Sequence, residues 1–238
     1  MIRNKYFQVI AQYIVILIIP IFLITLNARI VINSSSLYHY GFEKYSITDI
    51  TRISHQDLMS VSESIRDYFN NAEEFLYVST VVNNIKVYSL YNDREIQHMV
   101  DVKKLIQSSY LILNISTILL LLMLIFTIFK HRKKIVNTIY PISALIKYGS
   151  ILTISIILIL TTLSFFDFET VFYQFHILSF SNDLWQLDPS RDYLIAMFPT
   201  GFFFDTTIII GAMTLIEAII LLIFSFFIPF FITKYRLS

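Results

Sequence analysis

Four long apolar stretches divide the chain. They lie at roughly residues 9–32, 111–129, 151–166 and 206–233. Each approaches the about 20 residues that a helix needs to cross a hydrocarbon core about 30 Å thick. The third stretch is the shortest, and we expect it to take in residues 147–150 or 167–169 at its ends. The pattern predicts four transmembrane helices.

The basic residues that flank these stretches predict the orientation of the chain. Three segments, residues 1–7, 130–148 and the tail after Thr233, contain nine Lys and Arg and no acid. All 17 Asp and Glu lie elsewhere, ten of them in residues 33–105 and six in residues 167–205, with Glu217 inside the fourth stretch. Because Lys and Arg are enriched in cytoplasmic loops, we expect both termini in the cytoplasm and the two acidic loops outside.

The predicted fold is that of an all-α membrane protein, with four transmembrane helices and a small mixed α/β extracytoplasmic cap. The first stretch is too long for the apolar core of a signal peptide and lacks a small-residue cleavage site, so we expect an uncleaved anchor. The predicted segments are an N-terminus with the first span (1–32), an outer loop (33–106), a second span (107–130), a basic cytoplasmic loop (131–148), a third span (149–167), a second outer loop (168–205) and a fourth span with a cytoplasmic tail (206–238).

The first outer loop shows helical and strand patterns. It opens with a polar and aromatic segment, residues 33–45, and residues 56–70 then place apolar side chains at spacings of three and four, which predicts an amphipathic helix. Residues 75–82 and 85–90 predict a hairpin across Asn83 and Asn84, because asparagine tolerates the positive φ of a tight turn. We expect the next helix to have Asp93 as its N-cap and to continue through His98 into the second span.

The second outer loop is rich in aromatic residues. Residues 172–180 surround His176, residues 181–183 predict a turn, and Trp185 is the only tryptophan. Asp188 and a following proline resemble the start of a short helix over residues 190–198, ended by residues 199–201. Asp205 is the expected cap of the fourth span.

Composition excludes several functions. The chain has no cysteine, so it has neither a disulfide nor a thiol nucleophile, and its four glycines form no phosphate-binding loop. A net charge of +1 gives no reason to expect nucleic acid. Neither HExxH nor GxSxG is present, so we expect no metal, no cofactor and no serine hydrolase site.

Two histidines are the strongest candidates for chemistry. His98 precedes Asp101 by three residues, and His176 is followed by Asp183 and Asp188. Histidine exchanges protons near neutral pH, and a neighbouring carboxylate can fix its tautomer. Spacing alone leaves open whether these are catalytic groups or interfacial histidines satisfied by loop hydrogen bonds. The other histidines are His39, His55 and His131, and the intramembrane charges are Arg29 and Glu217.

Two stretches carry a family resemblance. Residues 91–105, with HMVDV at 98–102, and residues 175–189, with SNDLWQLDP at 181–189, resemble the two signature stretches of the bacterial lipoprotein intramolecular transacylase (Lit) family. Residues 192–199 continue the likeness, whereas Thr200 stands where an acidic or amide residue is expected. The resemblance implies an enzyme that moves the sn-2 acyl chain of a diacylglyceryl-modified cysteine onto the α-amine of that cysteine, giving the lyso-form lipoprotein.

The resemblance also implies which residues act. His98 and His176 map onto two essential histidines of the family, and the supporting or substrate-binding residues that we expect are Asp101, Asn182, Asp183, Trp185, Asp188 and Arg29. We expect His176 to take the amine proton and His98, oriented by Asp101, to polarise the ester, with the opposite assignment left open.

The expected setting follows from the same resemblance. The chain would be a monomer in the bacterial cell membrane, with its site on the extracytoplasmic side, acting on lipoprotein N-termini among membrane lipids. The alternatives are a non-enzymatic membrane assembly protein and an outer-leaflet lipid esterase.

Overall fold

A computed structural model of the chain describes residues 2–131 and 135–236. Arg132, Lys133 and Lys134 of the predicted basic loop lie outside the described residues, as do the side chains at both ends of the chain. The cytoplasmic orientation of the termini stays a prediction. The elements in the described residues are α1 (Ile2–Ile32), α2 (Ser35–Lys44), α3 (Ile47–Thr51), α4 (His55–Asn70), β1 (Thr80–Val82), β2 (Ile85–Val87), α5 (Asp93–His131), α6 (Ile135–Phe166), α7 (Phe168–Ser179), α8 (Tyr193–Met197) and α9 (Thr200–Arg236).

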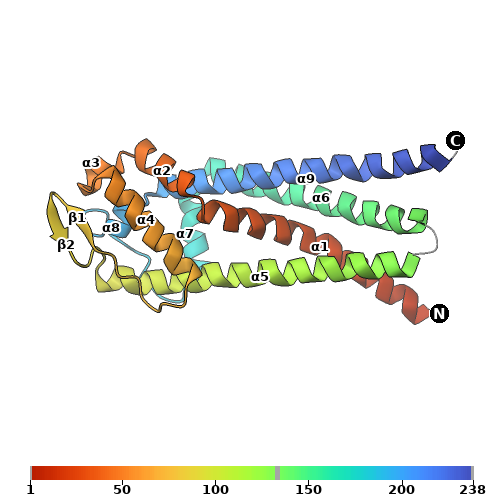
Figure 1. Cartoon of the computed structure of the whole chain (residues 1–238), viewed down its shortest axis with the longest axis horizontal. Coiled ribbons are helices and arrows are strands. Elements are labelled where there is room, and N and C mark those ends of the chain that lie inside the picture. Colours follow the sequence, from red (N-terminus) through yellow and green to blue (C-terminus); the bar gives the residue numbers. More distant parts are fainter. Residues whose placement is uncertain (1, 132–134, 237–238) are drawn as a thin grey trace. The chain divides into compact units, whose positions relative to one another are not determined.

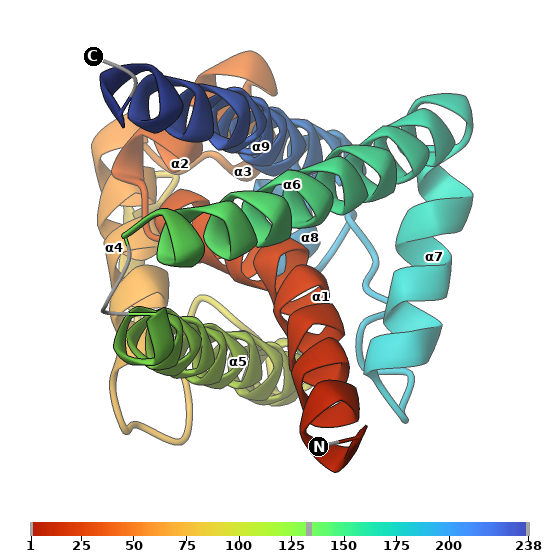
Figure 2. The same cartoon turned by 90° about the vertical axis from the view of Figure 1, so that its right-hand side faces the viewer.

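In the part of the chain that the structure describes, four helices are long and apolar enough to cross a membrane, which confirms the prediction of four. The candidate spans are Ile10–Ile32 in α1, Asp93–Lys130 in α5, Tyr140–Phe166 in α6 and Thr200–Phe227 in α9. The chain divides into two compact units, and the first takes in α1 up to Ala28, α5 from Tyr110, α6 up to Thr162 and α9 from Ile210. Figures 1 and 2 show these helical segments side by side.

A small core holds the first unit together. Val15, Ile19 and Leu23 of α1 pack with Ala218 of α9 in one buried cluster. Many other Leu, Ile and Phe side chains of these helices are exposed, as expected for surfaces that face lipid.

Glu217, the acid inside the fourth span, has a partner in the first unit. The fully buried Asn27 donates from Nδ2 to Glu217 Oε2 at 2.7 Å and lies 3.1 Å from Thr214 Oγ1. Pairing with polar neighbours is what an ionisable group within a membrane helix requires.

The second unit comprises residues 29–109 and 163–209. The predicted amphipathic helix is confirmed as α4, which buries Leu58, Val61, Ile65 and Tyr68. Ser54 caps this helix by accepting a hydrogen bond from the Asp57 N–H. Within the unit α2 packs on α4 and α3 packs on α8.

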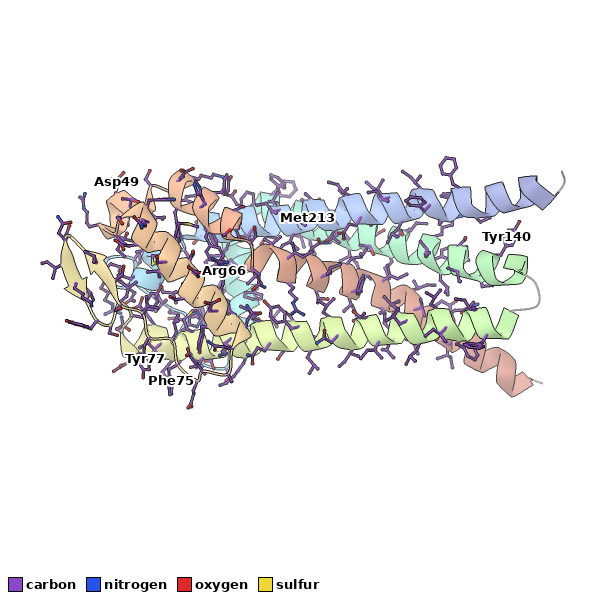
Figure 3. The ribbon with its side chains drawn as sticks, viewed as in Figure 1. Asp49, Arg66, Phe75, Tyr77, Tyr140 and Met213 are labelled. Carbon is purple, nitrogen blue, oxygen red and sulfur yellow. The ribbon has the colours of Figure 1, made fainter. Side chains whose placement is uncertain are left out.

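The predicted hairpin is also present, but it is shorter. Strands β1 and β2 pair antiparallel across Asn83 and Asn84, which have φ of 50° and 63°. Positive φ at both turn residues is typical of a type I′ turn. Side chains before β1 alternate between buried and exposed, and Tyr77 projects outward with 70% of its surface exposed (Figure 3).

Three helices of the second unit, α2, α3 and α7, were not predicted. Residues 35–44 form α2, which buries Leu37, Tyr38, Gly41 and Phe42. The aromatic segment around His176 forms α7, whose N-cap Asp167 accepts from the Thr170 N–H at 3.0 Å. Aromatic side chains of both segments take part in packing, as the contacts of Tyr38 with Phe198 and of Phe172 with Phe203 show.

The predicted N-cap of α5 is wrong by one residue. Asn92 Oδ1 accepts from the Glu95 N–H at 3.1 Å, and Glu95 Oε2 accepts from the Asn92 N–H at 2.8 Å. This reciprocal pair is a capping box, so Asn92 and not Asp93 caps the helix.

Two further predicted helix starts are also corrected. Helix α8 begins at Tyr193, because Asp188 closes a turn by accepting from the Ser190 N–H at 2.9 Å. Helix α9 begins at Thr200, directly after Pro199, so Asp205 lies within the helix instead of capping it. The Asp205 carboxylate is engaged by Lys44 Nζ at 2.7 Å.

Candidate active site

The structure brings His98 and His176 together. His98 lies in the second turn of α5, and His176 lies in the last turn of α7. Their ring centroids are 6.4 Å apart, and the ring planes are inclined by 30°. Both side chains are buried, with 7% and 8% of their surface exposed. Two histidines that are 78 positions apart in the sequence therefore face each other in a site shielded from bulk water.

A backbone carbonyl fixes the tautomer of His176. The Nδ1 atom lies 2.7 Å from the carbonyl oxygen of Phe172, one helical turn earlier. Because a carbonyl oxygen only accepts, Nδ1 must carry the hydrogen, and Nε2 presents its lone pair. Burial lowers the pKa of His176, and the bond to Phe172 opposes that shift. The neutral ring is thus arranged as a base at Nε2.

Aromatic rings surround this base. The Trp185 ring lies 4.8 Å from the His176 ring, centroid to centroid, and the Phe172 ring lies 4.4 Å away, edge to face. Phe180 contacts both histidines, at 5.7 Å from His176 and 5.3 Å from His98. Such an enclosure removes water and strengthens electrostatic interactions inside it.

Asn182 positions the loop that carries Trp185. Its Nδ2 donates to Asp101 Oδ2 at 2.8 Å, and its Oδ1 accepts from the Leu184 N–H at 3.1 Å. Its backbone carbonyl accepts from Trp185 Nε1 at 3.0 Å. One residue therefore joins the loop to α5 and orients the indole against His176.

Asp101 serves this loop and does not contact His98 directly. Within the described residues, its carboxylate bonds Asn182 and lies 3.4 Å from Lys104 Nζ. The buried Nδ1 of His98 has no hydrogen-bond partner in that part of the chain. We expected Asp101 to orient His98, but no hydrogen bond joins these two side chains within the described residues.

The remaining predicted site residues are Asp183, Asp188 and Arg29. The Arg94 guanidinium donates to the Asp183 carbonyl and lies 3.9 Å from the carboxylate of the same residue. Hydrogen bonds from the Ser190 hydroxyl and N–H lower the pKa of Asp188, which shapes the turn before α8. Arg29 lies exposed in the last turn of α1.

Two buried acids were missed by the sequence analysis. Glu95 is only 1% exposed, and its Oε1 accepts from the Leu194 N–H at 2.6 Å. Asp192 is 2% exposed and accepts from Asn92 Nδ2 at 2.9 Å and from the Asp188 N–H at 2.7 Å. These bonds join the start of α5, one turn before His98, to α8. The spacing of Asn92 and Glu95 is a capping-box signal that could have revealed part of this frame.

A polar cavity of about 200 Å³ lies beside the same frame. It is lined by residues of α3, the hairpin turn and the 189–196 segment, among them Arg52, Asn83, Arg191 and Asp192. Neither histidine lines it. We therefore locate the candidate chemistry at the aromatic enclosure and not in this cavity.

The family model described as lipoprotein intramolecular transacylase Lit matches residues 13–203. The chain belongs to this family. The resemblance found in the sequence is thereby confirmed. Membership of the Lit family identifies the chain as a lipoprotein intramolecular transacylase, an enzyme and an integral membrane protein with four apolar helices.

Solved structures of a Lit protein share the fold. The membrane integral lipoprotein intramolecular transacylase Lit from Bacillus cereus matches with a TM-score of 0.78 and 22% identity, over 98% of this chain and 100% of that chain. Variants of that protein with one histidine replaced by arginine or by alanine match with TM-scores of 0.73 and 0.72, each at 22% identity. The match to the arginine variant covers 99% of this chain and 98% of that one, and the match to the alanine variant covers 99% and 100%. A comparison with curated proteins gives no significant match.

Proposed function

We propose that this Lit-family chain moves the sn-2 acyl chain of a diacylglyceryl-modified lipoprotein cysteine onto the α-amine of the same cysteine. The observation that carries the proposal is the buried pair of His98 and His176, facing each other from α5 and α7. The product is an N-acylated lyso-form lipoprotein that keeps one ester-linked chain.

His176 acts as the base. An α-amine has a pKa of about 8 and is mostly protonated at neutral pH, so it must lose a proton before it can attack. The Nε2 lone pair accepts this proton, since the Phe172 carbonyl holds the hydrogen on Nδ1. The amine nitrogen then attacks the sn-2 ester carbonyl carbon.

His98 acts on the ester oxygens. Its imidazole lies opposite His176, and its buried Nδ1 has no hydrogen-bond partner within the described residues that would hold the ring in another role. The tetrahedral intermediate collapses when the bond from the carbonyl carbon to the sn-2 oxygen breaks. His98 passes to that oxygen the proton that His176 took from the amine, so both imidazoles return to the neutral state that their burial favours. One C–N bond replaces one C–O bond. The protonated amine loses two protons in all: one ends on the glyceryl hydroxyl, and the other is released to water.

Donor and acceptor belong to one molecule. Well-oriented intramolecular reactions reach effective molarities of about 10⁵ M or more, so holding the substrate in one conformation supplies much of the rate. Conversion of an ester to an amide runs downhill and needs no nucleotide. The sequence contains no cysteine that could form a thioester acyl-enzyme, which favours direct transfer.

The aromatic enclosure favours transfer over hydrolysis. Trp185, Phe172 and Phe180 pack around the His176 ring. In this proposal they keep water away, so that the substrate amine is the nucleophile nearest the ester. An esterase would need water at the same point and would release free fatty acid. Both histidines come from one chain, so the site is complete in a monomer.

The site belongs on the extracytoplasmic side in this proposal. The basic segments of the sequence assign both termini to the cytoplasm by the positive-inside rule, and the unit that carries the histidines then faces outward. Partners are the lipoprotein N-terminus and the lipids of the cell membrane.

A crossover experiment tests the reaction. The purified chain receives two diacylglyceryl lipopeptides that differ in peptide mass, one of them with isotopically heavy acyl chains. Each product should be isobaric with its own substrate, and fragmentation should find the moved chain on nitrogen. Products of mixed mass would show intermolecular transfer, and loss of a whole chain would indicate an esterase. A substrate with an acetylated amine is the control, and it should not react.

A further inference from the structure

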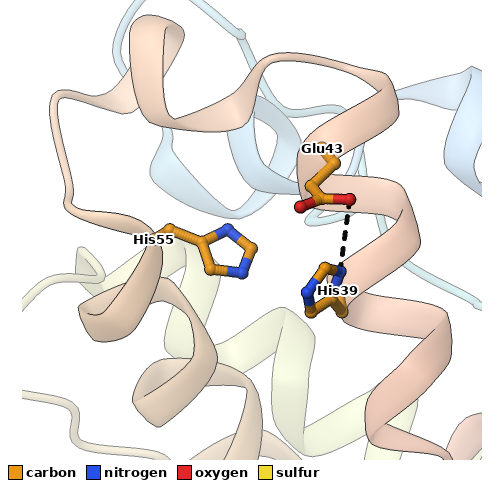
Figure 4. A group of neighbouring side chains, drawn as sticks. All are labelled: His39, Glu43 and His55. Carbon is orange, nitrogen blue, oxygen red and sulfur yellow. Dashed lines mark ion pairs between the residues drawn. The ribbon is translucent and has the colours of Figure 1, made fainter.

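A second cluster of ionisable side chains lies in the outer segment that follows α1. His39 and Glu43 are one turn apart on α2, and His55 is the first residue of α4. One nitrogen of each histidine and one oxygen of Glu43 all lie within 4.8 Å of one another. Figure 4 shows the carboxylate and the two imidazole rings turned toward one another.

The separations suit a small divalent cation. Zinc bound to nitrogen and oxygen at about 2.0–2.1 Å in a tetrahedron places neighbouring ligand atoms about 3.4 Å apart. His39 Nδ1 and Glu43 Oε2 already lie 3.4 Å apart. The side chains of both residues are more than half exposed, so they can move toward His55 without disturbing the core.

His55 supplies an independent observation. Its Nε2 atom is buried and has no hydrogen-bond partner within the described residues. A buried ring nitrogen without a partner is costly in a folded protein unless water or an ion satisfies it. The His55 ring lies 4.8 Å from the His39 ring, centroid to centroid, and Figure 4 shows the Glu43 carboxylate beside the same His39 ring.

We propose that His39, Glu43 and His55 form a binding site for a divalent transition-metal ion of the zinc class. Two neutral imidazoles and one carboxylate are a ligand set that zinc uses in proteins, with a fourth position left for water. The ion joins α2 to the start of α4, and it restrains the intervening segment that contains α3. This proposal is independent of the acyl transfer, because neither His98 nor His176 takes part.

The alternative for these residues is a simple His–Glu ion pair. That pair would explain the contact between His39 and Glu43, which are four residues apart on one helix. It leaves the buried Nε2 of His55 unexplained. A simple ion pair also predicts no zinc binding, whereas a metal site predicts zinc binding that requires all three residues.

Metal content measures the site directly. The full chain, purified in detergent without a histidine tag, is dialysed against Zn²⁺, and bound zinc is counted by elemental analysis and titrated by calorimetry. One ion per chain is expected, and Glu43→Gln or His55→Ala should weaken binding by at least about 100-fold. Glu63→Gln on the exposed face of α4 is the matched control and should bind as the wild type does.

His98→Ala separates this site from the catalytic pair. This variant should keep its zinc. Zinc lost in His98→Ala but retained in His55→Ala would place the ion at the histidine pair and overturn the proposal. Absence of zinc from the wild-type chain, or equal binding by His55→Ala, would also overturn it.

A variant that keeps a metal ligand at position 55 distinguishes loss of the metal site from misfolding of the chain. The chain has no cysteine, so His55→Cys introduces a single thiol at the site. Cobalt(II) added to this variant should give a thiolate charge-transfer band that the wild type lacks, and Glu43→Gln in the same variant should weaken it. A folded His55→Cys chain with no such band would contradict a metal site at these residues.

Discussion

Asn182 donates a hydrogen bond of 2.8 Å to Asp101, and this bond joins the loop that carries Trp185 to the helix that carries His98. The same asparagine orients Trp185 through its backbone carbonyl. This side-chain pair therefore helps to connect the two halves of the histidine site, which come from segments far apart in the sequence, alongside the contact of Arg94 with Asp183. Asn182 and Asp101 are positioning residues in this account.

Loss of the Asn182 side chain should slow the reaction without unfolding the protein. Asn182→Ala is expected to lower the rate of lyso-form production about 10- to 100-fold, because a displacement of about 1 Å at a reacting centre costs about that much. Initial rates with a synthetic lipopeptide measure the effect. Gln186→Ala is the matched control, since the Gln186 side chain is exposed in the same loop and is not among the expected site residues.

A double-mutant cycle tests the pairing itself. Asp101→Ala should add little to Asn182→Ala, because each variant removes the same bond. Fully additive losses, or an Asn182→Ala enzyme as active as Gln186→Ala, would contradict a positioning role for the pair.

The pH profile should report the burial of His176. Burial penalises the imidazolium and lowers the pKa of His176, so the base stays neutral and active to a lower pH than free imidazole, which titrates near about 6.5. The acid limb of kcat/KM should therefore lie below about 6.5, separate from the substrate amine that titrates near about 8.

Removal of part of the aromatic enclosure around His176 should move the acid limb of the kcat/KM profile. Trp185→Ala exposes the His176 ring, weakens the desolvation that lowers its pKa, and should shift the acid limb to higher pH. Tyr173→Phe, which changes a half-exposed ring beside Trp185, should leave it in place. An unshifted limb in an active Trp185→Ala enzyme would mean that His176 is not the titrating base.

Glu95 should be a major source of stability. Its buried carboxylate accepts from the Leu194 N–H in a buried hydrogen bond and from the Asn92 N–H in a partly buried one, so Glu95→Ala leaves both donors unpaired. Each unpaired donor costs about 1–3 kcal/mol, and we expect the free energy of unfolding to fall by about 2–5 kcal/mol. Unfolding in mixed detergent micelles measures it. Asp93→Ala, at an exposed acid in the first helical turn, should cost about 0.5 kcal/mol, and equal losses in the two variants would refute this assignment.

Gly41 allows α2 to lie against Phe202 of α9. A Cβ at this position would stand 2.4 Å from a carbon of the buried Phe202 ring. Gly41→Ala should therefore lower the free energy of unfolding by about 1–3 kcal/mol, as overpacking does. At Gly211 the nearest atom would be 3.5 Å away, an ordinary contact, so Gly211→Ala should be neutral or slightly stabilising. Equal thermal midpoints for the two variants would contradict the close packing at Gly41.

Local signals made some elements predictable from the sequence. The period of Leu58, Val61 and Ile65 identifies α4, and Asn83 with Asn84 identifies the hairpin turn, because each pattern depends on residues close in the chain. The lengths of the apolar stretches identify the four candidate spans.

Long-range contacts were not predictable in the same way. Helical spacing placed Asp101 on the face of His98, but the carboxylate instead bonds Asn182, 81 residues away. His39 and His55 lie on different helices, and only the packing of α2 on α4 brings them together. Spacing on one helix predicts which side chains share a face, whereas tertiary packing decides which partner each side chain meets.

The central claim is that the pair of His98 and His176 moves an acyl chain within one lipoprotein. Mass spectrometry of N-terminal lipopeptides, from a bacterium without a lipoprotein N-acyltransferase, tests it most directly. Expression of the wild-type chain should convert the free-amine diacylglyceryl form into an isobaric N-acyl lyso-form, identified by fragmentation, and His131→Ala should do the same.

His98→Ala and His176→Ala should each reduce that conversion by about 10²- to 10⁴-fold while remaining inserted in the membrane. Lyso-form lipopeptide at the wild-type level from either inserted alanine variant would contradict the account.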